Sequence, residues 1–260
     1  MAAEDVLAHI HIPKTAGTSV RLWLFTAYPQ GFGTIYPGYD LDETSLAAAG
    51  LGNTAMRAFS THDIRRFPAT YCGRTMRYFT LLRDPVKHTI SNLLYLKQTL
   101  SDLPATVRAE YPADVDKLST RDLTAVLMEK RPSTFGWQTD FIAEHTWRER
   151  AANPDDREAY LRERLALAQS ILRAFVVAGT VERLPESLDL LRERSAAWGF
   201  ALLPGQEIGW DNVTRVKRDD LAWMIDPGDE VGARLLEMMD DDRRLHAFAN
   251  ALLDEARANR

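Results

Sequence analysis

The chain has 260 residues, and its 32 Lys and Arg against 37 Asp and Glu give a formal net charge of −5. Hydrophobic residues make up 45% and charged residues 27%, the ordinary mixture of a globular protein. The negative charge argues against a protein that binds bare nucleic acid, and no apolar run approaches the ~20 residues that cross a bilayer. Cys72 is the single cysteine, so no intrachain disulfide can form. We therefore expect a cytoplasmic protein without a transmembrane segment.

The N-terminal segment has the pattern of a strand, a tight loop and a helix. Apolar residues alternate over 6–12, which predicts a strand. After a short loop with Gly17, apolar side chains recur at helical spacing over 19–27. Thr18 and Ser19 are both suited to cap this helix.

The same pattern recurs further along the chain. Residues 76–82 predict an apolar strand, after which Asp84 is suited to cap a helix and Pro85 to occupy its first position. A third apolar strand is predicted at 175–179, with a long helix on each side. Strands that alternate with helices imply a parallel sheet and an α/β fold.

The remaining segments are predicted to be mostly helical. Helices are expected at 119–130, at 135–145 and over the charged tail, whereas 28–58 is expected to be a long excursion from the sheet. No repeat or Gly/Ser linker marks a boundary, so we predict a single domain over 1–260 with C-terminal helices at 229–260. The apolar positions of that tail fit either packing on the body or a homodimer contact.

The loop at 13–19 joins the first strand to its helix and suits a phosphate. Main-chain N–H groups at a helix N-terminus and the positive end of the helix dipole attract anions. Gly17 permits close approach or positive φ, and Lys14 supplies a mobile charge. Hydroxyl donors come from Thr15, Thr18 and Ser19. The lysine precedes the glycine, so the loop is not a Walker A motif; an ordinary strand-to-helix turn is the alternative.

A second anion site is predicted after the second strand. Arg83 ends that strand, and Ser91 lies eight residues on in the following helix. Because the ends of parallel strands face one edge of a sheet, this site should lie beside the first. A guanidinium fork matches a phosphate, which favours a ligand with phosphates at both ends. The alternative is that Arg83 pairs with Asp84 and that Ser91 merely packs.

Together the two loops resemble those of sulfotransferases that use 3′-phosphoadenosine 5′-phosphosulfate (PAPS), in the branch of the hexuronyl 2-O-sulfotransferases and related carbohydrate enzymes (sulfotransferase family 2). In that family a Pro-Lys-Thr-Ala-Gly/Ser-Thr-Ser loop holds the 5′-phosphosulfate, and an Arg-Asp-Pro segment with a later serine holds the 3′-phosphate. The resemblance implies one P-loop-like domain, with a central parallel sheet flanked by helices and a helical C-terminal part. It implies PAPS as donor, adenosine 3′,5′-bisphosphate (PAP) as product, and no required metal. The donor-binding residues that it implies are Lys14, Thr15, Ala16, Gly17, Thr18, Ser19, Arg83, Ser91, Thr214, Arg215 and Lys217.

The resemblance also implies catalytic roles. His62 stands in the aromatic-x-x-His setting of the family's catalytic base, and Lys14 is placed to stabilise charge on the departing phosphate. His11, which directly precedes the phosphate loop, is the rival base. His9 and His11 form a pair that could bind zinc, but no Cys or carboxylate has convincing spacing, so we expect no metal site.

Aromatic side chains are the candidates for binding the acceptor substrate. Aromatic residues cluster at 23–39 and at 135–147, where they either line an acceptor pocket or pack in the core, and Gln138 is a candidate polar contact. Arginines are interleaved with acidic residues, which favours a small, neutral or lipid-linked hydroxyl acceptor over a long polyanion, and the resemblance adds a carbohydrate hydroxyl. Two other functions stay open: a nucleotide-dependent kinase, and a non-catalytic nucleotide-binding module.

Overall fold

The structure, a computed structural model, describes residues 5–35, 55–62, 69–71, 73–102, 105–109, 111, 115, 117–132, 135–150, 154–205, 222–226 and 228–259. Contacts divide the chain into two compact units. We call the first the sheet unit; it comprises Met1–Arg83, Gln138–Asn212 and Leu245–Arg260. We call the second the helical unit; it comprises Asp84–Trp137 and Val213–Arg244. The single domain expected over 1–260 stays a prediction.

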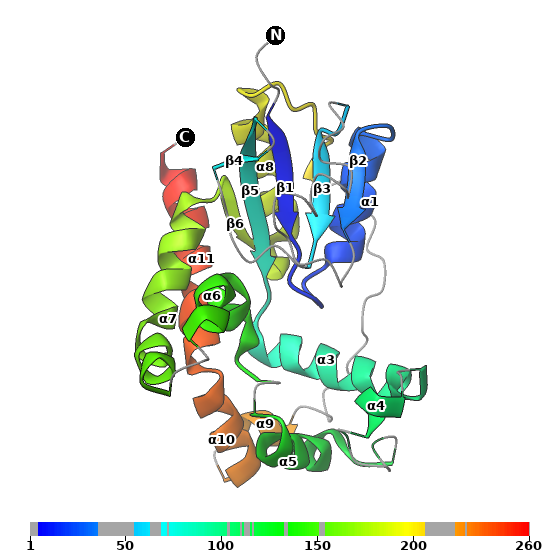
Figure 1. The fold of residues 1–260 in the computed structure, drawn as a ribbon, viewed down its shortest axis with the longest axis vertical. Coiled ribbons are helices and arrows are strands. Elements are labelled where there is room, and N and C mark those ends of the chain that lie inside the picture. Colours follow the sequence, from blue (N-terminus) through cyan, green and yellow to red (C-terminus); the bar gives the residue numbers. More distant parts are fainter. Residues whose placement is uncertain are drawn as a thin grey trace. The chain divides into compact units, whose positions relative to one another are not determined.

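The sheet unit is built on parallel strands, as the sequence predicted. In spatial order, the parallel strands of the described residues are β2 (Phe32–Ile35), β3 (Ala58–Thr61), β1 (Val6–Ile10), β5 (Arg74–Leu82) and β6 (Val177–Thr180). A short strand, β4 (Thr70–Tyr71), pairs antiparallel with the start of β5. Figure 1 shows β1 between β3 and β5. The α/β class is confirmed, and three of the strands coincide closely with the predicted ones.

Strand β1 forms the centre of the core. All five of its residues are buried, because strands pair on both of its edges and side chains cover both faces. On the face that carries Leu7, the side chains of Val20 and Trp23 from α1 (Gly17–Ala27) join those of Leu188 and Leu191 from α8 (Leu184–Ala196). The first helix is therefore held against the sheet by its apolar stripe.

Further helices complete the sheet unit. They are α6 (Trp137–Arg150), α7 (Pro154–Ala174), the 3₁₀ turn η4 (Val181–Arg183) and α11 (Asp240–Ala258), which enters this unit at Leu245. Tyr160 of α7 is fully buried, and Leu253 of α11 packs in the core. Arg183 ties η4 to two helices, because its guanidinium lies 2.6 Å from Glu186 and 2.8 Å from Asp254.

The helical unit has its own apolar core. Its helices are α3 (Pro85–Thr99), η2 (Leu100–Asp102), α4 (Ala105–Arg108), α5 (Thr120–Lys130), α9 (Ala222–Ile225) and α10 (Glu230–Met238). Ile90, Leu123 and Leu235 are fully buried in that core. The predicted start of α3 is confirmed: the Asp84 carboxylate accepts a hydrogen bond from the Lys87 N–H at 3.0 Å, and Pro85 occupies the first turn.

The predicted excursion at 28–58 was wrong over 32–35, and 36–54 lie outside the described residues. Within 28–58, residues 32–35 form the sheet strand β2, paired with β3 in the register Phe32↔Ala58 to Ile35↔Thr61. Four residues that include Gly33 and Thr34 carry too little hydrophobic alternation to be recognised as a strand. Pairing with β3 supplies the stability that the local sequence lacks.

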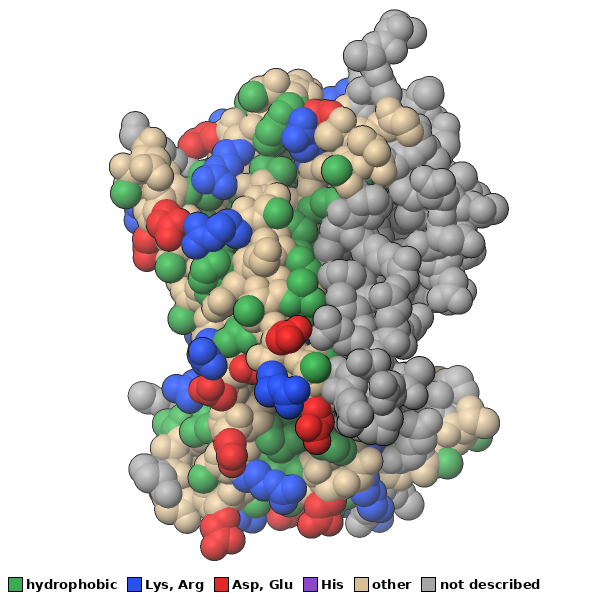
Figure 2. Space-filling view, turned by 60° about the vertical axis from the view of Figure 1, so that its left-hand side comes forward, with side chains coloured by type: hydrophobic (Ala, Val, Ile, Leu, Met, Phe, Trp, Pro, Cys, Tyr) green, Lys and Arg blue, Asp and Glu red, His purple; other side chains and the backbone are tan. Residues whose placement is uncertain are grey.

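The described surface mixes charges of both signs. Figure 2 shows one face, on which Lys and Arg side chains are interspersed with Asp and Glu and do not gather in one basic patch. Within the sheet unit, ion pairs join Arg173 to Glu255, Arg183 to Asp254 and Arg257 to Glu186. Among the described helices, none combines the length and the apolar character needed to cross a membrane.

Candidate functional site

Three predicted functional segments lie at the ends of neighbouring strands. His62 directly follows β3, the loop at 11–16 follows β1, and Arg83 directly follows β5. These strands are parallel and in register, with Ile10 paired to both Thr61 and Thr80, so their carboxyl ends meet at one edge of the sheet. At β1 the order of strands also switches from one side of the sheet to the other, the position where ligands bind in open α/β sheets.

The loop before α1 has an unusual main chain. Lys14 and Ala16 have φ angles of 67° and 64°, in the left-handed region that non-glycine residues rarely occupy. Each such residue stores about 1–3 kcal/mol of strain, which accumulates at functional sites. Left-handed residues beside a helix N-terminus are typical of the concave turns that bind anions. The loop therefore has the main-chain geometry of an anion site.

The start of α1 differs from the prediction. The helix begins at Gly17 with Ala16 as its N-cap, and no side chain caps it, so the predicted caps Thr18 and Ser19 were wrong. Thr15 is fully buried, and both its hydroxyl and its N–H donate to the Ile12 carbonyl, at 2.7 and 3.3 Å. The hydroxyl that we expected to donate a hydrogen bond to a phosphate instead donates within the loop and stabilises it.

Glycine is needed at position 17 because a neighbouring side chain lies very close to its Cα. Its φ angle is not in the left-handed region, so backbone conformation is not the reason. A Cβ at this position would overlap the imidazole of His11. The glycine therefore lets the first turn of α1 lie directly against a buried ring, which is one of the two reasons that the sequence suggested for it.

Adjacent substitutions in this loop should have opposite effects on stability. Ala16→Gly is expected to raise the free energy of unfolding by about 1 kcal/mol, because glycine adopts a left-handed φ without strain. Gly17→Ala is expected to lower it by about 1–3 kcal/mol, because the new methyl group displaces the His11 ring. Urea unfolding of both variants measures these two changes in the free energy of unfolding. Equal effects of the two substitutions would contradict the loop geometry.

Two cationic side chains converge on the loop. The Arg83 guanidinium donates from Nη1 to the Lys14 carbonyl at 3.0 Å. Burial, and then the charge of Arg83, lower the pKa of Lys14. The two charges repel each other, and an anion bound beside them would relieve that repulsion. The electrostatics thus favour a negatively charged ligand.

Arg83 is held in place by Gln138, which the sequence offered only as a candidate polar contact for the acceptor substrate. The buried amide of Gln138 accepts from the Arg83 N–H through Oε1 and donates to the Arg83 carbonyl through Nε2, both at 2.9 Å. Gln138 thus clamps the main chain of the arginine. No sequence signal could have indicated this pair, since the two residues lie 55 positions apart.

Removing this clamp should destabilise the protein. Gln138→Leu is expected to lower the free energy of unfolding by about 2–3 kcal/mol, because two main-chain groups of Arg83 lose their partners. Gln138→Glu keeps an acceptor and should lose about half of that. Gln98→Leu, at an exposed position of α3, serves as the control and should stay within about 0.5 kcal/mol of wild type. Urea titrations measure the free energy of unfolding of the three variants. Equal values for Gln138→Leu and Gln98→Leu would contradict the clamp.

His62 has the tautomer that a general base needs. Its Nδ1 lies 2.7 Å from the His11 carbonyl oxygen, and because a carbonyl can only accept, Nδ1 carries the proton. In the neutral ring Nε2 is then the basic nitrogen. The rings of His11 and His62 lie 4.1 Å apart between centroids.

The rival base, His11, lies in a different environment. Its side chain is 7% exposed. Burial, followed by the charges of His9, His62 and Arg21, lowers its pKa far below the usual range. A nitrogen so weakly basic is a poor general base near neutral pH. The surroundings therefore favour His62 over His11.

His9 continues this series of rings into the core. It is fully buried, its Nδ1 lies 2.9 Å from the Ser60 hydroxyl, and its ring stacks on Phe79 at 4.8 Å and on His11 at 5.3 Å. Burial, with the charges of His62 and Arg21, lowers the pKa of His9 to about 3. Among the described residues, no group of three or more His, Cys, Asp or Glu is arranged for a metal ion. That the protein requires no metal ion stays a prediction.

The buried histidines should make the fold sensitive to acid. Below the ordinary histidine pKa of 6.5, the unfolded chain binds protons that folded His9 refuses until about pH 3, so stability is full above pH 6.5 and is lost as the pH falls. His9→Asn should reduce the slope of unfolding free energy against pH, between pH 6.5 and 5, by up to about 1.4 kcal/mol per unit. Urea titrations at several pH values measure it. An unchanged slope would contradict a neutral, buried His9.

The other predicted donor-binding residues lie outside the described part of the sheet unit. Ser91 is buried in α3 of the helical unit, and Thr214, Arg215 and Lys217 lie outside the described residues. Tyr36 and Tyr39 also lie outside them, as does the side chain of Trp147. Trp23, Phe135 and Phe141 are at most 5% exposed, so these aromatic side chains belong to the core and do not line an open pocket.

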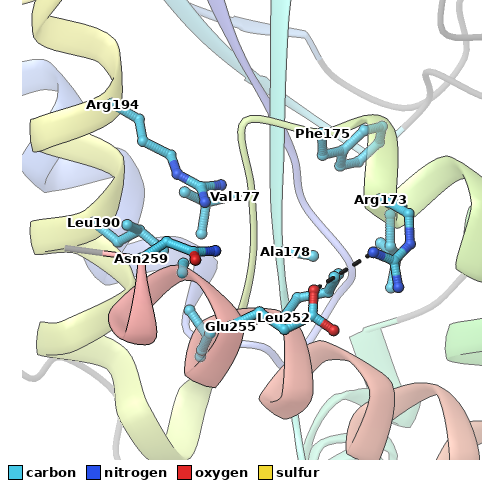
Figure 3. Close-up of a pocket in the computed structure, with 12 residues that line it drawn as sticks. Arg173, Phe175, Val177, Ala178, Leu190, Arg194, Leu252, Glu255 and Asn259 are labelled. Atoms are coloured by element: carbon cyan, nitrogen blue, oxygen red, sulfur yellow. Dashed lines mark hydrogen bonds and ion pairs between the residues drawn. The ribbon is translucent and has the colours of Figure 1, made fainter.

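A separate cavity lies in the sheet unit. It has a volume of about 190 Å³ and is lined by residues of α7, β6, α8 and α11. Figure 3 shows Arg173 and Glu255 at this cavity, joined by an ion pair of 3.5 Å. Its β6 residues are Val177 and Ala178, at the start of that strand, whereas the predicted site lies at the strand ends. The cavity contains no residue of the predicted site.

Comparison with known proteins adds no assignment, because no family model matches the chain and no curated protein matches it. The functional interpretation depends on the two motifs and on the geometry of the sheet edge.

Proposed function

We propose that this protein is a sulfotransferase that moves the sulfuryl group of PAPS to a hydroxyl of a carbohydrate, small-molecule or lipid-linked acceptor. One observation carries the proposal. His62 and Arg83, from the ends of β3 and β5, each donate a hydrogen bond to a main-chain carbonyl of the segment that follows β1. A candidate base and two candidate anion ligands are thereby tied to the same strained loop.

The loop and its cations support PAPS as the donor substrate. The 5′-phosphosulfate would contact Lys14 and the N–H groups at the start of α1, where the dipole and the left-handed turn favour an anion. Arg83 would contact the 3′-phosphate with its guanidinium fork. The family motif adds Ser91 to this phosphate, and that assignment stays a prediction.

In the proposed reaction, His62 and Lys14 would have different roles. The acceptor oxygen bonds to sulfur as the bond from sulfur to the 5′-phosphate oxygen breaks, and PAP leaves. His62 Nε2 receives the proton of the acceptor hydroxyl, because Nδ1 already donates to His11. Lys14 stabilises the negative charge that develops on the departing phosphate. The proposal requires no metal ion.

The surface charge bears on the class of acceptor. Charges of both signs are interspersed on the face in Figure 2, which favours a small or neutral hydroxyl acceptor over a long polyanion. The cytoplasmic location and a homodimer stay predictions from the sequence.

Calorimetric titration with nucleotides tests the donor site. Without added metal, PAP should bind at least ten times more tightly than AMP, because AMP lacks the 3′-phosphate that Arg83 would contact. A preference for ATP with Mg²⁺ would instead support a kinase. Tight PAP binding without transfer of ³⁵S from labelled PAPS to a panel of sugars, alcohols and glycolipids would support a non-catalytic binding module.

A further inference from the structure

We infer that His11 is a positioning residue whose imidazole sets the spacing between the base His62 and the donor loop at Gly17. The inference rests on the proposed function for its catalytic consequence. Its structural basis is that His11 contacts both elements at once. The ring lies 4.1 Å from the ring of His62 and fills the space beside the Cα of Gly17.

The main chain of His11 anchors the base. Its N–H donates to the Thr61 carbonyl at 2.8 Å, and its own carbonyl accepts from His62 Nδ1 at 2.7 Å. Thr61 and His62, at the end of β3, are therefore both hydrogen-bonded to the main chain of His11. The second of these bonds holds His62 in the tautomer with a basic Nε2.

The side chain of His11 cannot retreat from either contact. On its inner side it stacks on His9, which is fully buried and stacks in turn on Phe79. Phe79 is 1% exposed. A close-packed interior transmits displacements instead of absorbing them, so a shift of the ring at Gly17 must also move His62.

Burial also keeps the His11 ring uncharged. The lowered pKa of His11 keeps its ring neutral near pH 7, so that it adds no positive charge beside His62. A flexible or charged side chain would not reproduce this combination of a planar shape and neutrality. Phenylalanine is planar and neutral but has no ring nitrogen, so His11→Phe distinguishes a spacing role from proton transfer.

The tautomer of His62 can be read without any assay of activity. Long-range ¹H–¹⁵N NMR on histidine-labelled protein should show the Nδ1–H form, with the signals assigned by loss in His62→Gln. His11→Ala retains the carbonyl but removes the ring, and should give averaged tautomers for His62. His11→Phe should restore the wild-type pattern. Wild-type signals in His11→Ala would overturn the inference. If that variant does not fold, His11→Leu takes its place.

Kinetics then separate positioning from catalysis. His11→Ala should lower kcat about 10- to 100-fold, because misplacement of a base by about 1 Å has effects of this size. PAP affinity should stay within about threefold, and His11→Phe should recover most of the rate. A phenylalanine variant as slow as the alanine variant would make His11 the base and overturn the inference. If the protein transfers no sulfate, only the proposed function fails, and the NMR result still decides whether His11 positions His62.

Discussion

Replacement of His62 by alanine is expected to lower kcat for sulfuryl transfer about 10²- to 10⁴-fold, the usual contribution of a general base. PAP affinity should change by less than about threefold, because the imidazole would receive the acceptor proton and would not hold the nucleotide. The bond from Nδ1 to the His11 carbonyl fixes Nε2 as the nitrogen that would accept that proton. Loss of this nitrogen should therefore affect the chemical step alone.

Radiolabel transfer from PAPS measures kcat for His62→Ala, and calorimetry with PAP measures nucleotide affinity. His246→Ala provides the matched control, because the ring of His246 lies on α11 at 3.1 Å from Glu182 and outside the proposed site. That variant should keep the wild-type rate. An unchanged kcat in His62→Ala would favour the non-catalytic binding module, and a parallel loss of PAP affinity would place His62 in the nucleotide site.

Replacement of Lys14 by alanine is expected to lower kcat about 10²- to 10³-fold, the effect of removing one group that stabilises charge in a transition state. Donor affinity should fall as well, because in the proposed complex the ammonium would contact the anion before and after transfer. Burial, and then the charge of Arg83, lower the pKa of Lys14, so the substitution removes a disfavoured charge and should not destabilise the apo protein. The defect should thus be confined to the ligand-bound states.

Transfer kinetics and PAP calorimetry on Lys14→Ala test this expectation. Lys130→Ala removes an exposed lysine at the end of α5 and should change neither quantity. Lys14→Arg keeps the charge but replaces a compact ammonium by a wide fork, so it should recover nucleotide affinity better than rate. If Lys14→Ala leaves both affinity and rate unchanged, the 5′-phosphosulfate does not lie at this loop.

Local patterns in the sequence determined most elements and the order of the functional segments. The apolar runs of β1, β5 and β6 and the cap at Asp84 depend on neighbours within a few residues, so periodicity and capping rules identify them. Because the loop with Lys14 follows β1 and Arg83 follows β5, the rule that parallel strand ends share an edge was enough to group them.

Only the tertiary structure decided how these residues are held. Strand β2 exists because it pairs with β3, and Thr15 donates its hydroxyl inward because the loop closes on Ile12. The Gln138 clamp on Arg83 and the contact of His62 with His11 join residues 55 and 51 positions apart. Interactions over such separations leave no periodic or local signal in a single sequence. They arise only when folding brings the strand ends together, and they give the candidate base its tautomer and the candidate arginine its place.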